Sequence, residues 1–180
     1  MKNIKLYLII PIVIISVIVM SVFIVQSSQN KAIGLEEAVY TAESDIKIQE
    51  KRRVDLVYNL ADCVMQYDEH ESNTLIGLAD KMSNGNEINN VSTSISAIAY
   101  SYPELKSNEN YKQLMNELSI TENMIAQYRE NYNKSVNSYN RYVKKFPSRI
   151  FLDMTGYDIV EFERLDYNAP VDAPQNLFGD

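Results

Sequence analysis

The residue types most able to do chemistry surround the one histidine, in the stretch Tyr67 to Glu71, YDEHE. Asp68, Glu69 and Glu71 flank His70, and carboxylate and imidazole groups are common metal ligands. Closed metal sites generally take about four ligands, however, and on a helix His70 and Asp68 point in different directions. This stretch has two interpretations, a metal site and a solvated helix face. The pattern favours the solvated face, so we expect no metal.

Nucleophilic catalysis has few candidates. Cys63 is the one thiol, and the one imidazole, that of His70, would have to act as its base. Cys63 falls at a position of the apolar helical pattern, where a small buried side chain is the usual role. The five glycines stand at positions 34, 77, 85, 156 and 179, too far apart to cradle a phosphate. We therefore expect a protein that is not an enzyme and that needs no cofactor.

Polar residues at core positions of two helical patterns are more informative. Gln49 and Arg53 stand where the first pattern should be apolar, and Glu122 and Arg129 do so in the stretch TENMIAQYRENYNKSVNSYN. Buried charges are costly unless paired. We predict that Glu122 pairs with Arg53, Arg129 or both, with Gln49 and Asn123 completing a polar layer. Such layers fix helix register, and a ligand site is the alternative.

Tyrosines follow one side of the same helical pattern. Tyr128, Tyr132, Tyr139 and Tyr142 are separated by four, seven and three residues. Aromatic stripes at helical spacing are more often core than binding surface. Tyrosine is nevertheless enriched at protein interfaces, so these four residues are also a candidate interaction face.

Long helices must position these groups. Apolar residues recur at steps of four and three from Leu35 to Tyr67 and, after one shifted step, on to Met82. This heptad-like spacing predicts one helix over 35–82. A second helix is expected over 88–100. A third should begin after an Asn108 N-cap and continue to Pro147.

The expected fold is all-α, an elongated antiparallel bundle of long helices behind a transmembrane helix. After Pro147 the pattern predicts a short helix closed by Gly156, an extended stretch and an irregular tail. The expected segments are a short N-terminus at 1–5, a membrane anchor at 6–25, a linker at 26–34, the bundle at 35–147 and the C-terminal part at 148–180.

The stretch from Leu6 to Val25, LYLIIPIVIISVIVMSVFIV, contains no charge. As a helix, its 20 residues span about 30 Å, the thickness of a bilayer's hydrocarbon core. A cleaved signal peptide is the alternative. Signal peptides typically have a shorter apolar run, however, and the sequence QSSQNKA that follows Val25 is a poor cleavage site. Lys2 and Lys5 precede the run, so positive-inside counting places the N-terminus in the cytoplasm and the domain outside.

The remainder of the chain is acidic. The whole chain has 17 basic and 24 acidic residues, and beyond residue 25 a formal charge of −9 remains. Phosphates repel such a domain. We therefore expect no nucleic-acid partner.

Ordered motifs over most of the chain resemble the LemA family. They include SDIKIQEKRRVDLVYNL at Ser44, YPELKSNENYKQL at Tyr102, ELSITENMIAQYRENYN at Glu117, FP at Phe146, GY at Gly156 and APV at Ala169. Two positions depart from the family pattern, which commonly has Trp at Glu43 and Pro at Tyr58. The resemblance implies a bacterial membrane protein with an N-terminal membrane helix and a helical bundle, and implies no reaction. Proposals for the family place the short N-terminus outside the cell, opposite to the orientation that the charge count favours and that we keep.

Together these features predict a single-pass scaffold or interaction protein of the bacterial cell membrane. We expect it to have protein partners of unknown identity, with homo-oligomers left open. The alternative is a module that binds a small molecule or peptide at the polar layer.

Overall fold

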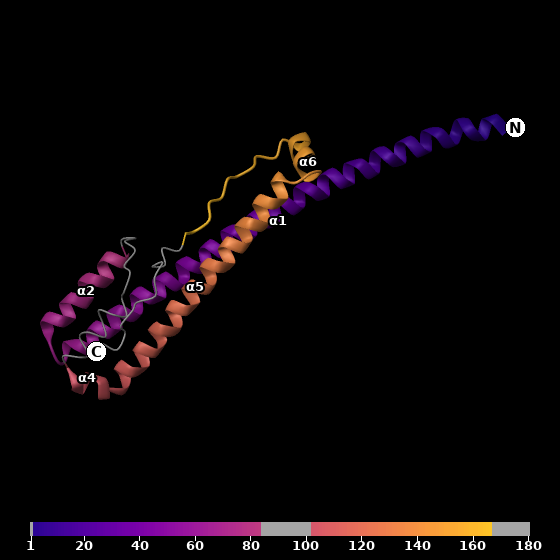
Figure 1. The fold of residues 1–180 in the computed structure, drawn as a ribbon. Coiled ribbons are helices and arrows are strands. Elements are labelled where there is room, and N and C mark those ends of the chain that lie inside the picture. The colour runs from indigo at the N-terminus through magenta and orange to yellow at the C-terminus, as the bar shows by residue number, and fades with distance from the viewer. Residues whose placement is uncertain (1, 84–101, 167–180) are drawn as a thin grey trace, which may run out of the picture. The chain divides into compact units, whose positions relative to one another are not determined.

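The computed structural model describes residues 2–83 and 102–166 (Figure 1). Within these ranges the chain forms helices and no strand. The helices are α1 (Lys2–Met65), α2 (Glu69–Ser83), α4 (Pro103–Ser107), α5 (Glu109–Lys144) and α6 (Ser148–Thr155). The predicted all-α class is therefore confirmed. The helix expected over 88–100 and the tail after residue 166 lie outside the described residues.

Helix α1 is 64 residues long and continues through Pro11. Proline is tolerated near the start of a long apolar helix because few backbone hydrogen bonds are lost there. Residues 26–34, assigned to a linker from the sequence, are helical as well. Between Pro11 and Gly34 the sequence contains neither Pro nor Gly, so nothing local interrupts the helix.

The chain divides into two compact units. The central unit is Gly34–Asn131, and the terminal unit combines Met1–Ile33 with Tyr132–Asp180. Helices α1 and α5 contribute to both units.

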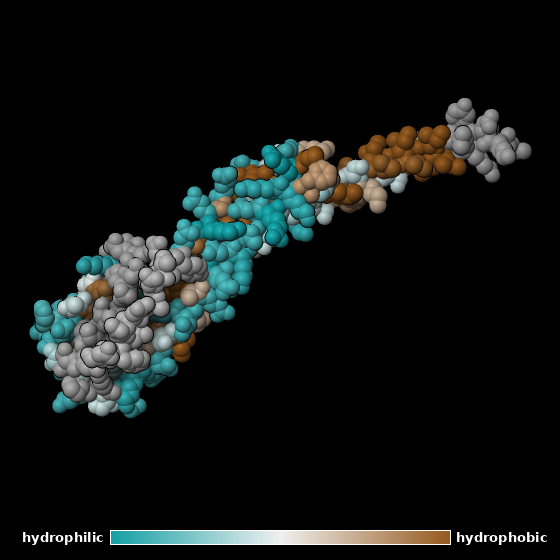
Figure 2. All heavy atoms as spheres, in the orientation of Figure 1, coloured by the Kyte–Doolittle hydropathy of each residue, from teal (hydrophilic) through white to brown (hydrophobic). Residues whose placement is uncertain are grey.

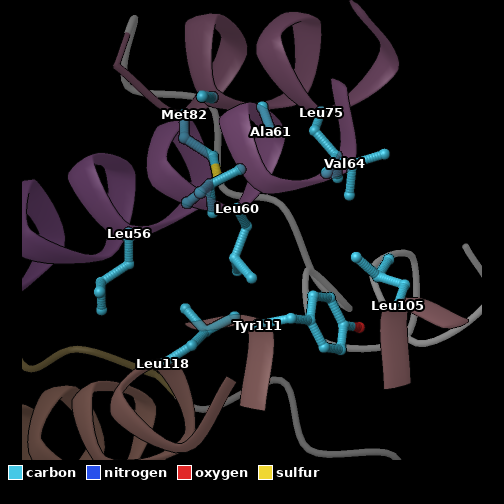
Figure 3. Close-up of a cluster of buried hydrophobic side chains, with 11 residues drawn as sticks. Leu56, Leu60, Ala61, Val64, Leu75, Met82, Leu105, Tyr111 and Leu118 are labelled. Carbon is cyan, nitrogen blue, oxygen red and sulfur yellow. The ribbon is translucent and has the colours of Figure 1, made fainter. Parts of the chain in front are cut away.

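The central unit has its core where α1, α2, α4 and α5 meet (Figure 3). Its side chains are Leu56, Val57, Leu60, Ala61, Val64, Leu75, Ala79, Met82, Leu105, Tyr111 and Leu118. Leu60, Leu75 and Leu118 are completely buried, and burying one such side chain is worth about 1.5–3 kcal/mol. The predicted four-three spacing accounts for Leu56 and Leu60 on α1 and for Tyr111 and Leu118 on α5.

Helix direction in the central unit follows from side-chain contacts. Asn108, just before α5, donates a hydrogen bond to the hydroxyl of Tyr67, just beyond the end of α1, at 3.3 Å, whereas Glu50 of α1 lies 2.9 Å from Arg129 of α5. Residue numbers therefore fall along α1 as they rise along α5, so this part of the pair is antiparallel.

The single helix predicted over 35–82 is wrong, because α1 ends at Met65 and α2 begins at Glu69. Asp68 caps α2: its Oδ1 accepts a hydrogen bond from the backbone N–H of Glu71 at 3.0 Å. Asp followed three residues later by Glu is a helix-start pattern. The turn lets α2 pack back on α1, where the Ser72 hydroxyl donates to the carbonyl of Ala61 at 2.9 Å.

The ends of α5 and α6 follow the sequence prediction. Asn108 Oδ1 accepts a hydrogen bond from the backbone N–H of Tyr111 at 3.1 Å, which is the expected N-cap of α5. Gly156 closes α6 with a left-handed φ of 67°, a conformation that glycine adopts without steric cost. Residues 157–166 form no helix, in agreement with the extended stretch that was predicted.

The α2 cap also predicts a pH dependence. The Tyr102 hydroxyl donates to Asp68 Oδ2 at 2.7 Å. This hydrogen bond and, to a smaller extent, the one from the Glu71 N–H lower the pKa of Asp68 below its ordinary value of 3.8. The Asp68 carboxylate in turn raises the pKa of Tyr102 above its ordinary value of 10.0. Asp68 stabilises the fold at pH values above the pKa that it has in the unfolded chain, and this stabilisation is lost as pH falls through its lower pKa in the folded chain. Tyr102 stabilises the fold at pH values below the pKa that it has in the unfolded chain, and this stabilisation is lost as pH rises through its higher pKa in the folded chain.

We therefore expect Tyr102→Phe to lower the free energy of unfolding near neutral pH. The difference in stability between the two proteins should shrink as pH falls below the ordinary Asp pKa and as pH rises above the ordinary Tyr pKa, because the contribution of the pair is lost in those ranges. Urea unfolding at neutral pH and at several values on each side measures this. The same pH profile for both proteins would contradict the predicted contact.

Candidate functional site

The polar cluster lies between α1 and α5 in the central unit. We define it as Gln49, Glu50, Arg53, Glu122 and Arg129. Arg53 Nη1 lies 3.5 Å from Glu122 Oε2, and Arg129 Nη2 donates to Glu50 Oε1 at 2.9 Å. The Arg53 side chain is 14% exposed and that of Glu122 33%, so water still reaches this pair. The two arginines therefore have different carboxylate partners.

The structure changes the membership of the predicted layer. Asn123 is exposed, because it lies one residue beyond the core-facing position of Glu122, and a helix turns by about 100° per residue. Glu50 joins instead, although the sequence pattern did not single it out. The available signal was its spacing: Glu50 precedes Arg53 by three residues, so both lie on one helix side.

Three polar atoms in this part of the helix pair are buried and have no hydrogen-bond partner among the described residues. They are Gln49 Oε1, Arg53 Nε and Thr121 Oγ1. Leaving one buried polar group unsatisfied costs about 1–3 kcal/mol. Gln49 and Arg53 of the cluster, and the adjacent Thr121, therefore retain hydrogen-bonding capacity that the described residues do not use.

One end of the polar cluster opens on a cleft of about 450 Å³. Its lining residues are Lys47, Glu50, Lys51, Arg53, Val54, Asp55, Tyr58, Met82, Ser83 and Arg129. The lining has four cationic and two anionic side chains, together with the apolar Val54 and Met82. This chemistry suits ion pairing and hydrogen bonding to a small anion with an apolar part.

Metal ligation has no candidate group in the described ranges, where no three His, Cys, Asp or Glu side chains come together suitably. His70 is exposed. Asp68 and Glu71 belong to the cap of α2, as described above. Cys63 is half-buried, and burial raises the pKa of its thiol, which disfavours the reactive thiolate.

The four tyrosines divide between the units. Tyr128 is half-buried in the central unit. In the terminal unit Tyr139 is fully buried, and its ring meets that of Phe162 edge to face with centroids 5.1 Å apart. The Tyr139 hydroxyl accepts a hydrogen bond from the backbone N–H of Val160 at 3.1 Å. Tyr139 is thus a core residue and offers no surface to a partner.

The other two tyrosines also contact their own chain. The Tyr132 hydroxyl donates to the carbonyl of Glu163 at 3.3 Å. The Tyr142 hydroxyl lies 2.9 Å from Ser28 Oγ and donates to the Ser28 carbonyl at 3.1 Å. The ammonium of Lys31 lies 5.2 Å from the centre of the Tyr142 ring. These contacts hold the extended segment and α1 against α5, so three of the four tyrosines of the candidate interaction face are used inside the terminal unit.

Comparison with known proteins assigns the chain to a family. The LemA family model matches residues 42–176, three quarters of the chain. The chain belongs to the LemA family. The matched range includes the whole polar cluster and the three tyrosines of the terminal unit.

This LemA family protein also resembles curated relatives over a shorter stretch. It is 32% identical over 81 residues to magnetosome protein MamQ 1 of Paramagnetospirillum magneticum. It is 35% identical over 81 residues to magnetosome protein MamQ of Magnetospirillum gryphiswaldense. Each match covers 44% of this chain and 30% of the relative's length.

The geometry of the polar cluster predicts a graded effect of charge removal. We expect Glu122→Gln to lower the free energy of unfolding by about 1–2 kcal/mol, because it leaves the mostly buried Arg53 without an anionic partner. The matched control is Glu117→Gln on the same helix, whose partner Arg52 is 50% exposed. Its loss should stay below about 1 kcal/mol. Urea unfolding of both variants measures the difference, and equal losses would contradict the structural role of Glu122.

Proposed function

We propose that this protein is a single-pass scaffold or interaction protein of the bacterial cell membrane that does no chemistry of its own. Its helical domain lies outside the cytoplasm and binds protein partners.

One observation carries the membrane part of the proposal: no described part of the chain covers the apolar stretch near the start of α1. From Ile9 to Ile24 the large apolar side chains are between 48% and 71% exposed. Figure 2 shows this stretch as a continuous brown surface. Helix α1 is long and apolar enough here to cross a membrane. Exposed apolar surface of this extent is unfavourable in water and favourable in lipid.

The orientation is supported by charge. Lys2 and Lys5 stand on the N-terminal side of the apolar stretch, whereas Glu36 and Glu37 follow Lys31 on the other side. The more basic flank stays in the cytoplasm by the positive-inside rule. Since the part beyond residue 25 has a formal charge of −9, we expect a protein partner to present a basic contact surface.

The cleft favours a second candidate function, the binding of a small anionic molecule. The observation behind it is the position of Arg53 and Arg129 in the cleft lining, together with the unsatisfied Nε of Arg53. Under this proposal the LemA domain would be a sensor whose ligand bridges α1 and α5.

Photocrosslinking of the full chain in native membranes tests the proposed function. A crosslinking residue replaces Ile48 or Ile120, which are 61% and 47% exposed on the central unit. The matched control replaces Val17 in the apolar stretch. We expect protein adducts at both central positions that weaken at high salt, because exposed charges are screened, and lipid adducts at Val17.

Two differently tagged copies in the same cells distinguish a homo-oligomer from another partner. The interaction proposal would be contradicted by an absence of protein adducts at Ile48 and Ile120 together with a defined small anion that co-purifies with the chain. That result would support the second candidate instead. Protease treatment of intact cells tests the orientation, since a domain outside the cytoplasm should be cut.

A further inference from the structure

A second exposed apolar surface lies at α6 in the terminal unit. Phe146, Ile150 and Met154 are 75%, 49% and 71% exposed, and their spacing of four places Ile150 and Met154 on one side of the helix. The opposite side carries Ser148 and Leu152, which are buried. Figure 2 shows apolar atoms where α6 lies in Figure 1. Phe146, Ile150 and Met154 are called the α6 face below.

The segment that carries the α6 face is basic. The segment 141–155 contains four basic residues and one acidic residue, all exposed: Arg141, Lys144, Lys145, Arg149 and Asp153. Its net charge of +3 contrasts with −7 for the whole chain. Apolar side chains bordered by basic ones are typical of helices that lie in the surface of an anionic membrane.

Contacts within the terminal unit place this segment beside the end of the apolar stretch of α1. The hydrogen bonds between Tyr142 and Ser28 join the end of α5 to α1. Ser28 follows Val25 by three residues, which is about 4.5 Å along a helix. Phe146 follows Tyr142 by four residues, so the α6 face begins close to the level at which the apolar surface of α1 ends.

We propose that α6 is a second membrane contact, lying in the interface of the same bilayer that α1 crosses. Phe146, Ile150 and Met154 enter the boundary between headgroups and acyl chains. Lys144, Lys145 and Arg149 face anionic headgroups. This inference rests on the proposed membrane anchor, because the anchor supplies the bilayer beside which α6 is held.

Fluorescence quenching of the full chain in lipid vesicles tests the inference. Cys63→Ala removes the natural thiol, and single cysteines then replace Ile150, Met154, Val17 or Lys134 for labelling with an environment-sensitive dye. Lys134 is the control, since it is exposed on α5 and precedes Tyr142 by eight residues, about 12 Å along the helix. The vesicles contain phosphatidylcholine with phosphatidylglycerol, and the quenchers are lipids labelled near the headgroup or at mid-chain.

We expect headgroup-level quenchers to reduce the emission from positions 150 and 154 strongly and that from position 134 little. Mid-chain quenchers should act on position 17. Combining Lys144→Gln, Lys145→Gln and Arg149→Gln should weaken the quenching at positions 150 and 154 and leave that at position 17 unchanged. Vesicles of phosphatidylcholine alone should have the same effect as this triple variant.

The possible failures are distinct. No quenching at position 17 would overturn the anchor and the proposed function with it. Quenching at position 17 without quenching at positions 150 and 154 would overturn the α6 contact alone. If those two positions are then also protected from aqueous iodide, a protein or a second copy of this chain covers the α6 face, and the lipid assignment is wrong.

Discussion

The rest of the structure depends on one requirement: the apolar stretch near the start of α1 must lie in an apolar environment. The side chains between Ile9 and Ile24 are covered by no described part of the chain, although they belong to the same continuous helix as the core residues Leu56 and Leu60. A bilayer satisfies that need, and helical geometry satisfies every backbone hydrogen bond within it. Because α1 continues from the apolar stretch into the central unit, membrane attachment and domain folding share one element.

Different interactions stabilise the two units. In the central unit, apolar side chains from four helices form the core, and paired charges occupy the neighbouring contact between α1 and α5. In the terminal unit, tyrosine hydroxyls and asparagine amides of α5 bind backbone groups of the extended segment. Asn133 and Asn140, for example, donate to the carbonyls of Leu165 and Phe162. This explains why the second half of α5 is rich in Tyr and Asn: an extended segment without a sheet partner needs side chains to bind its backbone.

The sequence predicts the helical class and the boundaries of α5 well, because periodicity and capping are local properties. Asn108, Pro147 and Gly156 each act through their own backbone geometry or a neighbour three residues away. The break between α1 and α2 was missed because the four-three spacing continues almost unchanged across it. The one shifted step and the Asp68 and Glu71 pair were the local signs of a turn.

The candidate site was less predictable for a physical reason. Periodicity gives the side of a helix on which a residue lies, so Arg53 and Glu122 were expected to meet. It does not give the axial offset of one helix relative to the other. That offset brings Arg129 to within 2.9 Å of Glu50. Nor does the sequence pattern distinguish a tyrosine that binds a partner from one such as Tyr139 that binds its own chain, because both uses favour an amphipathic aromatic side chain.

Hydrogen exchange of the full chain in lipid nanodiscs tests the central claim most directly, which is that α1 is one helix with its apolar stretch in lipid. Slow exchange is expected for the amides of residues 9–25, shielded by lipid, and continued protection for residues 26–34, which the structure places within the same helix. Rapid exchange throughout 9–25 would contradict the account, since an exposed helical end frays in water and a membrane-spanning one does not.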